Sequence, residues 1–483
     1  MDIGQTKQLF LDDAIIAGME GATRKLNQPT KHQGNPVVAM VRDDKRCWDA
    51  GLVMTFANVI LDEGGKVFKM WYGVGGGDVG GSDASVALAY ATSPDGITWH
   101  KPALGRAKFR GTTANNIVMN RDGCGTSVFR DPHETDPARR YKMLLRYEIC
   151  AAYSPDGLRW AEYNQGQPVI GGAHDGHNLA YWDDLLGKYV AIVRDRTGPI
   201  SEVRSQLVTD PEGRRGWKKL WDREGNRSPE NHTLRRIGQA ESDDFVNWTP
   251  TRCIVGADSD DPLNQDQFYN MEVMQYEGTR IGLMTVFSCD PAYSRAVVQL
   301  TCSRDGMNWE RVGGREVFLA PGLLEDVDWG TIYPAQAPVV VGDEIWIYYV
   351  AHARDHLGNR PEGAPEPEHT SGMALARLRL DGFVSVDAEE QGALTTRPFT
   401  FRGGELVINA DASDGQVMVE VQDVEGKPIP GFGRQDCLAL RADEVRHTVT
   451  WTGKEDLKAL EGKAVRLKFY LSRAKLFSLK FQN

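Results

Sequence analysis

The sequence predicts an all-β protein, a five-bladed β-propeller followed by a C-terminal β-sandwich. Two patterns predict this fold: a turn phrase that recurs along the chain, and three strand-like runs that precede each copy of it. The composition agrees, because 51 glycines and 12 tryptophans in 483 residues are typical of a chain with many tight turns and large aromatic packing surfaces.

The turn phrase reads Ser-x-Asp-Gly-x-x-Trp or a close variant. Serine, aspartate and glycine favour a tight turn between two strands, and the tryptophan that follows can pack against a neighbouring sheet. The recurrence of so long a phrase predicts a repeating structural unit. The copies are residues 93–99, 154–160, 242–248 and 303–309, and a weaker fifth copy is 380–383.

Three strand-like runs precede each turn, as judged from β-branched and aromatic residues and from period-two alternation. The first runs are 52–61, 125–131, 177–183, 269–276 and 332–341. The second runs are 67–73, 141–147, 188–194, 280–287 and 344–350. The third runs are 84–93, 148–154, 234–242, 295–303 and 371–378. Five units of this kind, each with a fourth strand, predict a five-bladed β-propeller.

Short alternating runs continue after the fifth unit and predict a second domain. They are residues 406–410, 417–422, 446–451 and 464–471, and they indicate a β-sandwich of about 90 residues. We therefore divide the chain into a propeller domain, residues 1–393, and a sandwich domain, residues 394–483. The stretches between 194 and 234 and between 354 and 370 are rich in proline and charge, which predicts loops over one face of the propeller.

Charge and hydropathy exclude several classes of partner. The chain has 56 Lys+Arg and 67 Asp+Glu, a net charge of −11, which argues against nucleic acid or an anionic membrane as the main partner. No stretch approaches the roughly 20 apolar residues that span a bilayer, and the first residues lack the features of an export signal. Seven scattered cysteines indicate reduced thiols. We expect a cytoplasmic protein that acts on a small carbohydrate, and a homo-oligomer is compatible with the sequence.

Polar residues at or near the start of the first run of each unit form the candidate site. The innermost strands of a propeller converge on a central channel, so their starts ring one mouth of it. Glu272 interrupts an otherwise apolar strand, which indicates a side chain that faces the axis. The other candidates are Trp48, Asp49, Asp175, His177, Asn178, Asp328 and Tyr333, with Arg194 at the end of a strand of unit three and His352 beside the loop of unit five.

Several phrases resemble bacterial proteins related to glycoside hydrolase family 32. They are Leu-Phe-Leu-Asp-Asp at 9–13, Asp-x-x-Asn at 175–178, Trp-Asp at 182–183, the run 188–194 and the tail from 397 to 478. The resemblance spans essentially the whole chain and extends to the five-bladed glycoside hydrolase superfamily, with families 43, 62, 68 and 130. It implies an exo-acting, furanosidase-like hydrolase of a small glycoside or oligosaccharide, and it is more specific for architecture than for reaction.

The resemblance also implies roles for carboxylates from different blades. One carboxylate attacks or activates water, a protonated acid releases the leaving oxygen, and a third holds the sugar. By position, Asp49 matches the nucleophile or base, and either Glu272 or Asp175 matches the general acid, the other being the stabiliser. Asp131 lies in an Arg-Asp-Pro phrase like that of family 32, but alignment on the turns places it at the far end of its inner strand.

The remaining candidates are predicted to hydrogen-bond sugar hydroxyls or to stack on the ring. They are Trp48, His177, Asn178, Arg194, Asp328, Tyr333 and His352. We expect no cofactor; the alternative is a divalent metal held by His174 and His177 with Asp175 between them. Two other functions stay open, a non-catalytic carbohydrate-binding propeller and a sugar lyase or phosphorylase on the same scaffold.

Overall fold

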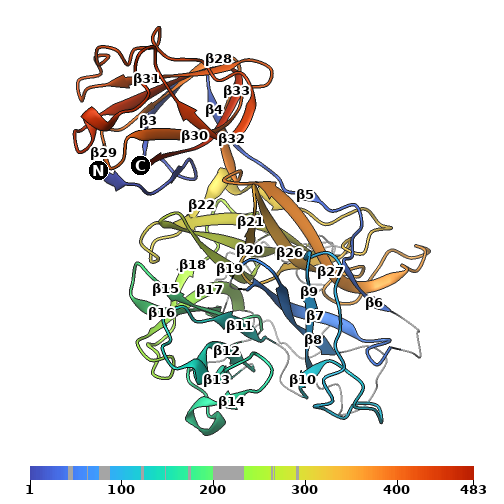
Figure 1. Cartoon of the computed structure of the whole chain (residues 1–483). Helices are drawn as coiled ribbons and strands as arrows, with labels where there is room; N and C mark the ends of the chain where they lie inside the picture. The colour runs from blue at the N-terminus through green and yellow to red at the C-terminus, as the bar shows by residue number, and fades with distance from the viewer. Residues whose placement is uncertain are drawn as a thin grey trace.

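The protein forms two lobes, a larger one built from five sheets and a smaller one that contains both ends of the chain (Figure 1). The structure, a computed structural model, describes residues 1–41, 47–62, 64–75, 87–120, 125–146, 148–171, 174, 176–199, 233–262, 265, 267–289 and 293–483. Strands dominate these residues, and the helical segments among them are short 3₁₀ turns such as η1 (Pro137–Arg139).

The larger lobe is a five-bladed β-propeller, as the sequence predicts. In blades one to three the strands lie side by side in chain order. The first strands contact one another from blade one to blade four, and the first strand of blade five contacts that of blade one. Blade one contains β7 (Val53–Leu61), β8 (Phe68–Gly75), β9 (Ala87–Ser93) and β10 (Ile117–Met119), and blade two contains β11 (Ser127–Arg130), β12 (Tyr141–Leu145), β13 (Cys150–Ser154) and β14 (Ala161–Glu162). Blade three contains β15 (Leu179–Asp183), β16 (Lys188–Pro199), β17 (Thr233–Ser242) and β18 (Arg252–Val255).

Blade four contains β19 (Gln267–Tyr276), β20 (Thr279–Cys289), β21 (Ser294–Ser303), β22 (Glu310–Arg311) and β23 (Val317–Leu319). Blade five contains β24 (Thr331–Pro334), β25 (Val339–Val341), β26 (Glu344–His352) and β27 (His369–Arg379). Its outer strands come from the other end of the chain, because β5 (Thr30–Lys31) and β6 (Val38–Val41) pair with β27. The N-terminal segment therefore closes the ring of blades.

The repeated phrase forms the same hydrogen-bonded turn in its four full copies. In the first copy, Ser93 Oγ accepts the Gly96 N–H at 2.8 Å and Asp95 Oδ1 accepts the Thr98 N–H at 2.7 Å. The Thr98 and Ile97 N–H groups, which both donate to this carboxylate, lower the pKa of Asp95 to about 2. The Trp99 indole donates to the Gly96 carbonyl at 3.1 Å. The serine and aspartate bonds recur at 154–160, 242–248 and 303–309, so the predicted turns are confirmed.

The smaller lobe joins strands from both ends of the chain. Its C-terminal strands are β28 (Val384–Thr396), β30 (Glu405–Asp411), β31 (Gln416–Gln422), β32 (Asp443–Val449) and β33 (Arg466–Gln482). Its N-terminal strands are β2 (Gln8–Leu9), β3 (Ile16–Glu20) and β4 (Thr23–Leu26), which pair with β33 or β28. In addition, β1 (Asp2–Gly4) pairs with β29 (Thr400–Phe401). The division at residue 393 and the β-sandwich stay predictions; the pairing adds residues 2–26 to the C-terminal strands.

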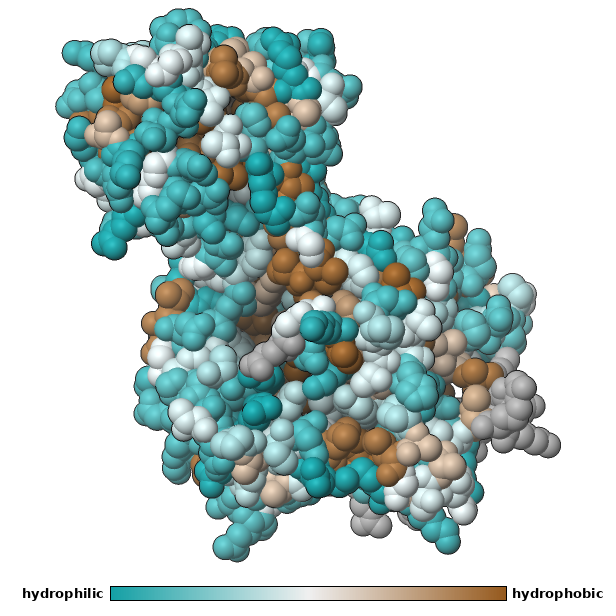
Figure 2. Space-filling view, viewed as in Figure 1, coloured by the Kyte–Doolittle hydropathy of each residue, from teal (hydrophilic) through white to brown (hydrophobic). Residues whose placement is uncertain are grey.

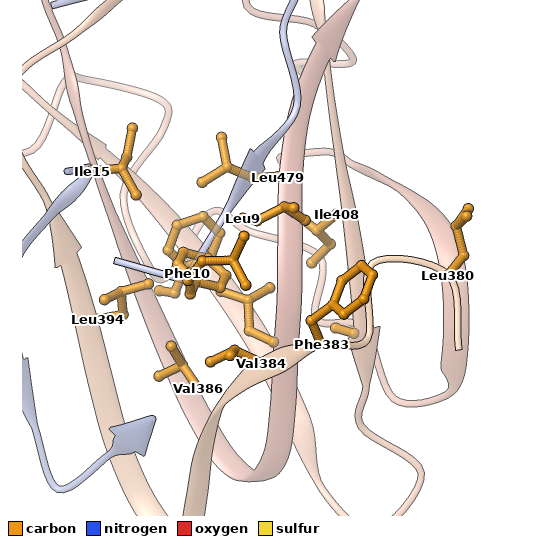
Figure 3. Close-up of a cluster of buried hydrophobic side chains, with 14 of the residues drawn as sticks. Leu9, Phe10, Ile15, Leu380, Phe383, Val384, Val386, Leu394, Ile408 and Leu479 are labelled. Carbon is orange, nitrogen blue, oxygen red and sulfur yellow. The ribbon is translucent and has the colours of Figure 1, made fainter. Parts of the chain in front are cut away.

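The apolar core of the smaller lobe continues into blades four and five. Figure 3 shows part of it, where Leu9 and Phe10 from the N-terminal segment lie among Leu394 and Leu479 from the C-terminal strands. The same buried cluster includes Ile281 of blade four. On the face shown in Figure 2 the surface is mainly hydrophilic, with hydrophobic residues gathered where the lobes meet. The shared core indicates that the two lobes are packed against each other.

The described residues contain no helix that is long and apolar enough to cross a membrane. The cytoplasmic location inferred from the sequence stays a prediction.

Candidate functional site

Glu272 lies at the centre of the propeller, on the inner strand of blade four. Its side chain is fully buried, and Oε1 accepts the Asn270 amide at 2.9 Å. The same oxygen lies 2.7 Å from Nδ1 of His177, two residues before the inner strand of blade three. The sequence pattern that singled out Glu272, a carboxylate in an apolar strand, thus led to a side chain that contacts the neighbouring blade.

His177 joins four blades at this point. Its second ring nitrogen, Nε2, lies 3.0 Å from the Thr126 carbonyl oxygen of blade two. The imidazole stacks on Phe56 of blade one, with the ring centres 4.8 Å apart and the planes 4° from parallel. The backbone before His177 also lies close to blade two, because a Cβ at Gly176 would lie 2.9 Å from the Cα of Gly125, so only glycine fits there. The ring is therefore fixed in both position and plane.

Arg194 braces the same region from β16. Its guanidinium donates to the Tyr269 carbonyl from Nε at 3.0 Å and from Nη2 at 2.8 Å, and Nη2 also donates to the Gly176 carbonyl at 2.8 Å. It lies 4.0 Å from the Tyr269 ring centre, a cation–π contact. His174 Nδ1 lies 2.8 Å from the Arg194 carbonyl oxygen. A positive charge is thus held beside the His177–Glu272 pair.

Aromatic rings from blades one, four and five pack around the axis. Tyr333 lies 5.2 Å from Tyr269 and 5.5 Å from Phe56 between ring centres. Its hydroxyl lies 3.0 Å from His356 Nδ1, and burial raises the pKa of Tyr333 well above its usual value. His352 packs edge-on against Tyr333 at 5.8 Å, and burial lowers the pKa of His352 to about 4. Both groups are therefore held neutral near pH 7.

We call these residues the axial cluster. It comprises Phe56, His177, Asn178, Arg194, Tyr269, Asn270, Glu272, Tyr333 and His352.

Several buried polar atoms of the axial cluster have no partner among the described residues. They are both side-chain amide atoms of Asn178, Oε2 of Glu272, Oδ1 of Asn270 and Nε2 of His352. Buried polar atoms are nearly always hydrogen-bonded to protein, water or ligand. These atoms offer acceptors as well as amide donors, so the cluster matches a ligand that carries several hydroxyl groups.

A belt of hydrogen bonds links the inner parts of four blades beside the axial cluster. Asn58 Nδ2 donates to Gln336 Oε1 at 3.2 Å, and Asn58 Oδ1 accepts the Val128 N–H at 2.8 Å. Gln336 Nε2 donates to the Ala180 carbonyl at 2.9 Å, and the Ala180 N–H donates to Ser127 Oγ at 3.0 Å. These bonds link blades one, two, three and five. We call this belt the axial floor.

Asp49 and Trp48 lie in a different setting from the axial cluster. Asp49 is 3% exposed, and its Oδ2 accepts from Lys101 Nζ at 2.7 Å. Trp48 donates its indole N–H to Asn116 Oδ1 at 2.7 Å, and Asn116 in turn donates to Tyr72. Lys101 and Asn116 belong to the outer part of blade one. The catalytic role of Asp49 stays a prediction, but the structure gives this carboxylate a lysine partner.

Two further aspartates are also engaged in ion pairs. Asp328 is 4% exposed and bonds to Lys31 Nζ at 2.6 Å and to the Tyr349 hydroxyl at 2.9 Å. Asp131 follows β11, where it pairs with Lys142 and accepts from the Tyr189 hydroxyl at 2.7 Å. Asp131 is thus at the far end of its inner strand, where the turn alignment predicts it.

Asp175 lies outside the described residues. Among those described, no group of three or more His, Cys, Asp and Glu side chains has the geometry to hold a metal ion. The divalent-metal alternative at His174 and His177 stays untested, since its carboxylate is Asp175.

The structure thus brings His177, Asn178, Arg194, Glu272, Tyr333 and His352 together, and leaves Trp48, Asp49 and Asp328 in separate contacts. The sequence reasoning missed Phe56, which looks like an ordinary core residue in its apolar strand, and the axial floor. The residues of the axial floor could have been found from the sequence, because Asn58 and Gln336 are polar residues in apolar runs, as Glu272 is.

No family model matches the sequence, and no curated protein matches it. Solved structures do match. One is described as a glycoside hydrolase, with 13% identity and a TM-score of 0.47 over 73% of this chain and 92% of that chain. Another is a β-1,2-mannobiose phosphorylase from Listeria innocua, with 11% identity and a TM-score of 0.47 over 73% and 97% of the two chains.

A third is the family 32 β-fructofuranosidase of Bombyx mori, with 12% identity and a TM-score of 0.40 over 95% of both chains. The chain is similar to these three proteins in structure, at low sequence identity.

Proposed function

We propose that the chain is a glycoside hydrolase that acts at the end of a small glycoside or oligosaccharide, with the axial cluster as its site. The observation that carries the proposal is the state of Glu272. One of its carboxylate oxygens is held by Asn270 and His177, and the other has no partner among the described residues. A carboxylate fixed in this way can exchange a proton with a glycosidic oxygen or with water.

The rest of the axial cluster supports a sugar as the ligand. Asn178 offers a carbonyl oxygen and an amide N–H group that lack partners among the described residues, and a sugar has hydroxyls that pair with both. The rings of Phe56, Tyr269 and Tyr333 supply apolar faces for the C–H groups of a pyranose or furanose. This mixture of few polar groups and aromatic walls is common in carbohydrate and small-molecule sites.

The axial floor supports action at a chain end. The hydrogen bonds of Asn58 and Gln336 link the inner strands of neighbouring blades beside the axial cluster, and we take them as the closed end of the pit. A terminal sugar fits a blind pit, whereas an internal sugar needs a groove open at both sides. We therefore propose that a single sugar is released at each turnover.

Hydrolysis needs a second carboxylate. We propose Asp175 for this role, because it lies two residues before His177 in the sequence. The catalytic role predicted for Asp49 is tested by the same assay, with Asp49→Asn as a further variant.

The test is a panel of 4-nitrophenyl glycosides of fructose, arabinose, xylose, fucose and galactose. For the glycoside that is cleaved best, we expect Glu272→Gln to lower kcat by about a thousandfold or more, since a positioned proton-transfer group contributes 10²–10⁴-fold. Glu420→Gln is the matched control. It changes a carboxylate that is 6% exposed and hydrogen-bonded in the smaller lobe, so its rate should equal that of the wild type.

Equal rates for Glu272→Gln and Glu420→Gln, with both variants folded, would overturn the proposed role of Glu272. Inorganic phosphate added to a second set of assays separates hydrolysis from phosphorolysis, which yields a sugar phosphate. Ligand binding without turnover on any member of the panel, with or without phosphate, would instead favour a carbohydrate-binding propeller.

A further inference from the structure

We propose that His177 is a positioning residue that shares one proton with Glu272, and that this makes Glu272 the proton acceptor of the site. The inference rests on the proposed function for its kinetic consequence, but the shared proton can be tested without turnover. The family resemblance implies that Glu272 is the general acid or the stabiliser and that Asp49 is the nucleophile or base, so this inference assigns Glu272 a different role.

The first step concerns Nε2 of His177. The atom 3.0 Å away is the carbonyl oxygen of Thr126, which can only accept a hydrogen bond. The histidine side chain is fully buried, and its stacking on Phe56 holds the ring in place. Nε2 must therefore carry a proton and donate it to this carbonyl. The remaining question is where the next proton of the pair resides.

The second step concerns the 2.7 Å contact between His177 Nδ1 and Glu272 Oε1. Such a short contact between two buried polar atoms needs one proton between them. Oε1 also accepts the Asn270 amide at 2.9 Å, so it already acts as an acceptor. With one shared proton the pair is neutral overall, either as a carboxylic acid with imidazole or as a carboxylate with imidazolium.

The third step excludes a second shared proton in the resting site. It would leave a net positive charge in a fully buried position, where an unbalanced charge is costly. The Arg194 guanidinium already holds a positive charge against the Gly176 carbonyl, next to His177. Among the described residues, the other titratable or charged groups that face this region are His174, Arg235, Tyr269, Tyr333, His352 and His356, and none of them is a carboxylate.

The consequence falls on Oε2 of Glu272, which has no partner among the described residues. When a water or hydroxyl oxygen attacks, its O–H bond breaks, the electron pair stays on that oxygen, and the proton moves to Oε2. The pair then holds two protons, as imidazolium and carboxylic acid, and returns one to solvent at the end of the turnover. In its resting state the pair has no proton on Oε2, so a different group must donate the proton to the leaving group.

Nuclear magnetic resonance of protein labelled with ¹⁵N-histidine tests the shared proton directly. His177 is assigned by comparison with His177→Asn. We expect a protonated Nε2 at every pH from 6 to 8, and an Nδ1 signal that moves toward that of a bare nitrogen in Glu272→Gln, which cannot share an acidic proton. A bare Nε2 in the wild type, or an Nδ1 signal unchanged in Glu272→Gln, would overturn the proposal.

The pH dependence of kcat/KM tests the direction of transfer. A proton acceptor must be unprotonated, so the wild-type rate should fall on the acid side of the profile. In His177→Asn the asparagine amide can still donate to Glu272 Oε1, but it cannot share a proton with it. The Glu272 carboxylate then takes up a proton more readily than the neutral wild-type pair does. We expect His177→Asn to move the acid limb to higher pH by about one unit or more.

His447→Asn is the matched control, because His447 lies 3.4 Å from Glu444 in a partly exposed pair of the smaller lobe. Its profile should match the wild type. An acid limb that stays in place in His177→Asn, or an alkaline limb that moves alone, would overturn Glu272 as acceptor. If no glycoside is turned over, the proposed function fails, while the resonance experiment still decides whether the proton is shared.

Discussion

At the scale of single residues, burial determines which side chains of the axial cluster can carry charge. His352 is partly buried and its Nε2 is sealed from solvent, which lowers its pKa from 6.5 to about 4. The folded protein therefore keeps this histidine neutral at a pH where the unfolded chain protonates it. Below pH 6.5 the unfolded state binds more protons, so the free energy of unfolding falls as the pH is lowered toward 4.

This linkage predicts a difference between the wild type and His352→Gln. Between pH 7 and pH 4.5 the wild type should lose about 2 kcal/mol more of its free energy of unfolding than the variant does, a figure reduced for the partial exposure of the ring. Urea unfolding at the two pH values measures both losses. Equal losses in the two proteins would show that His352 is protonated in the folded state.

The same scale shows how far a sequence can identify a site. Glu272 was identified because a carboxylate in an apolar strand must find a partner, and that rule concerns one residue and its immediate neighbours. Asp49 and Asp328 also lie near inner strands, but Lys101 and Lys31 take up their carboxylates. Those lysines are 52 and 297 residues away in the chain, and no local pattern indicates such partners.

At the scale of elements, the repeated turn was predictable because its hydrogen bonds lie within seven residues. The weak fifth copy has another function. Asp381 lies between β27 and β28 with φ 62°, and its buried carboxylate accepts from Lys7 Nζ at 2.9 Å and Ser478 Oγ at 2.7 Å. It also bonds to the Tyr276 hydroxyl of blade four and to Asn409. This turn fastens the propeller to the smaller lobe.

Asp381→Asn should therefore destabilise the protein by about 2–3 kcal/mol, because Lys7 loses its buried partner and keeps the more exposed Glu277, 3.5 Å away. Asp343→Asn is the control. Asp343 and Arg446 also join the lobes, but both are more than half exposed, so less than about 1 kcal/mol should be lost. Urea unfolding measures both. Equal losses would mean that Asp381 does not fasten the lobes.

At the scale of the whole molecule, the radial arrangement was predictable and its closure was not. Five similar units imply a ring, but the sequence does not reveal that β5 and β6 complete blade five. It also does not reveal that β2, β3 and β4 pair with C-terminal strands. These short strands have no strong alternation of their own, and they form because partners from the far end of the chain are already in place.

The central claim is that the axial cluster binds the sugar that is cleaved. A crystal structure of Glu272→Gln soaked with the best glycoside of the panel tests it most directly. We predict a sugar within hydrogen-bond distance of residue 272 and Asn178, above the axial floor. A sugar bound instead in another cleft, such as the one of about 460 Å³ lined by Asp12 and Arg304, with the axis empty, would contradict the claim.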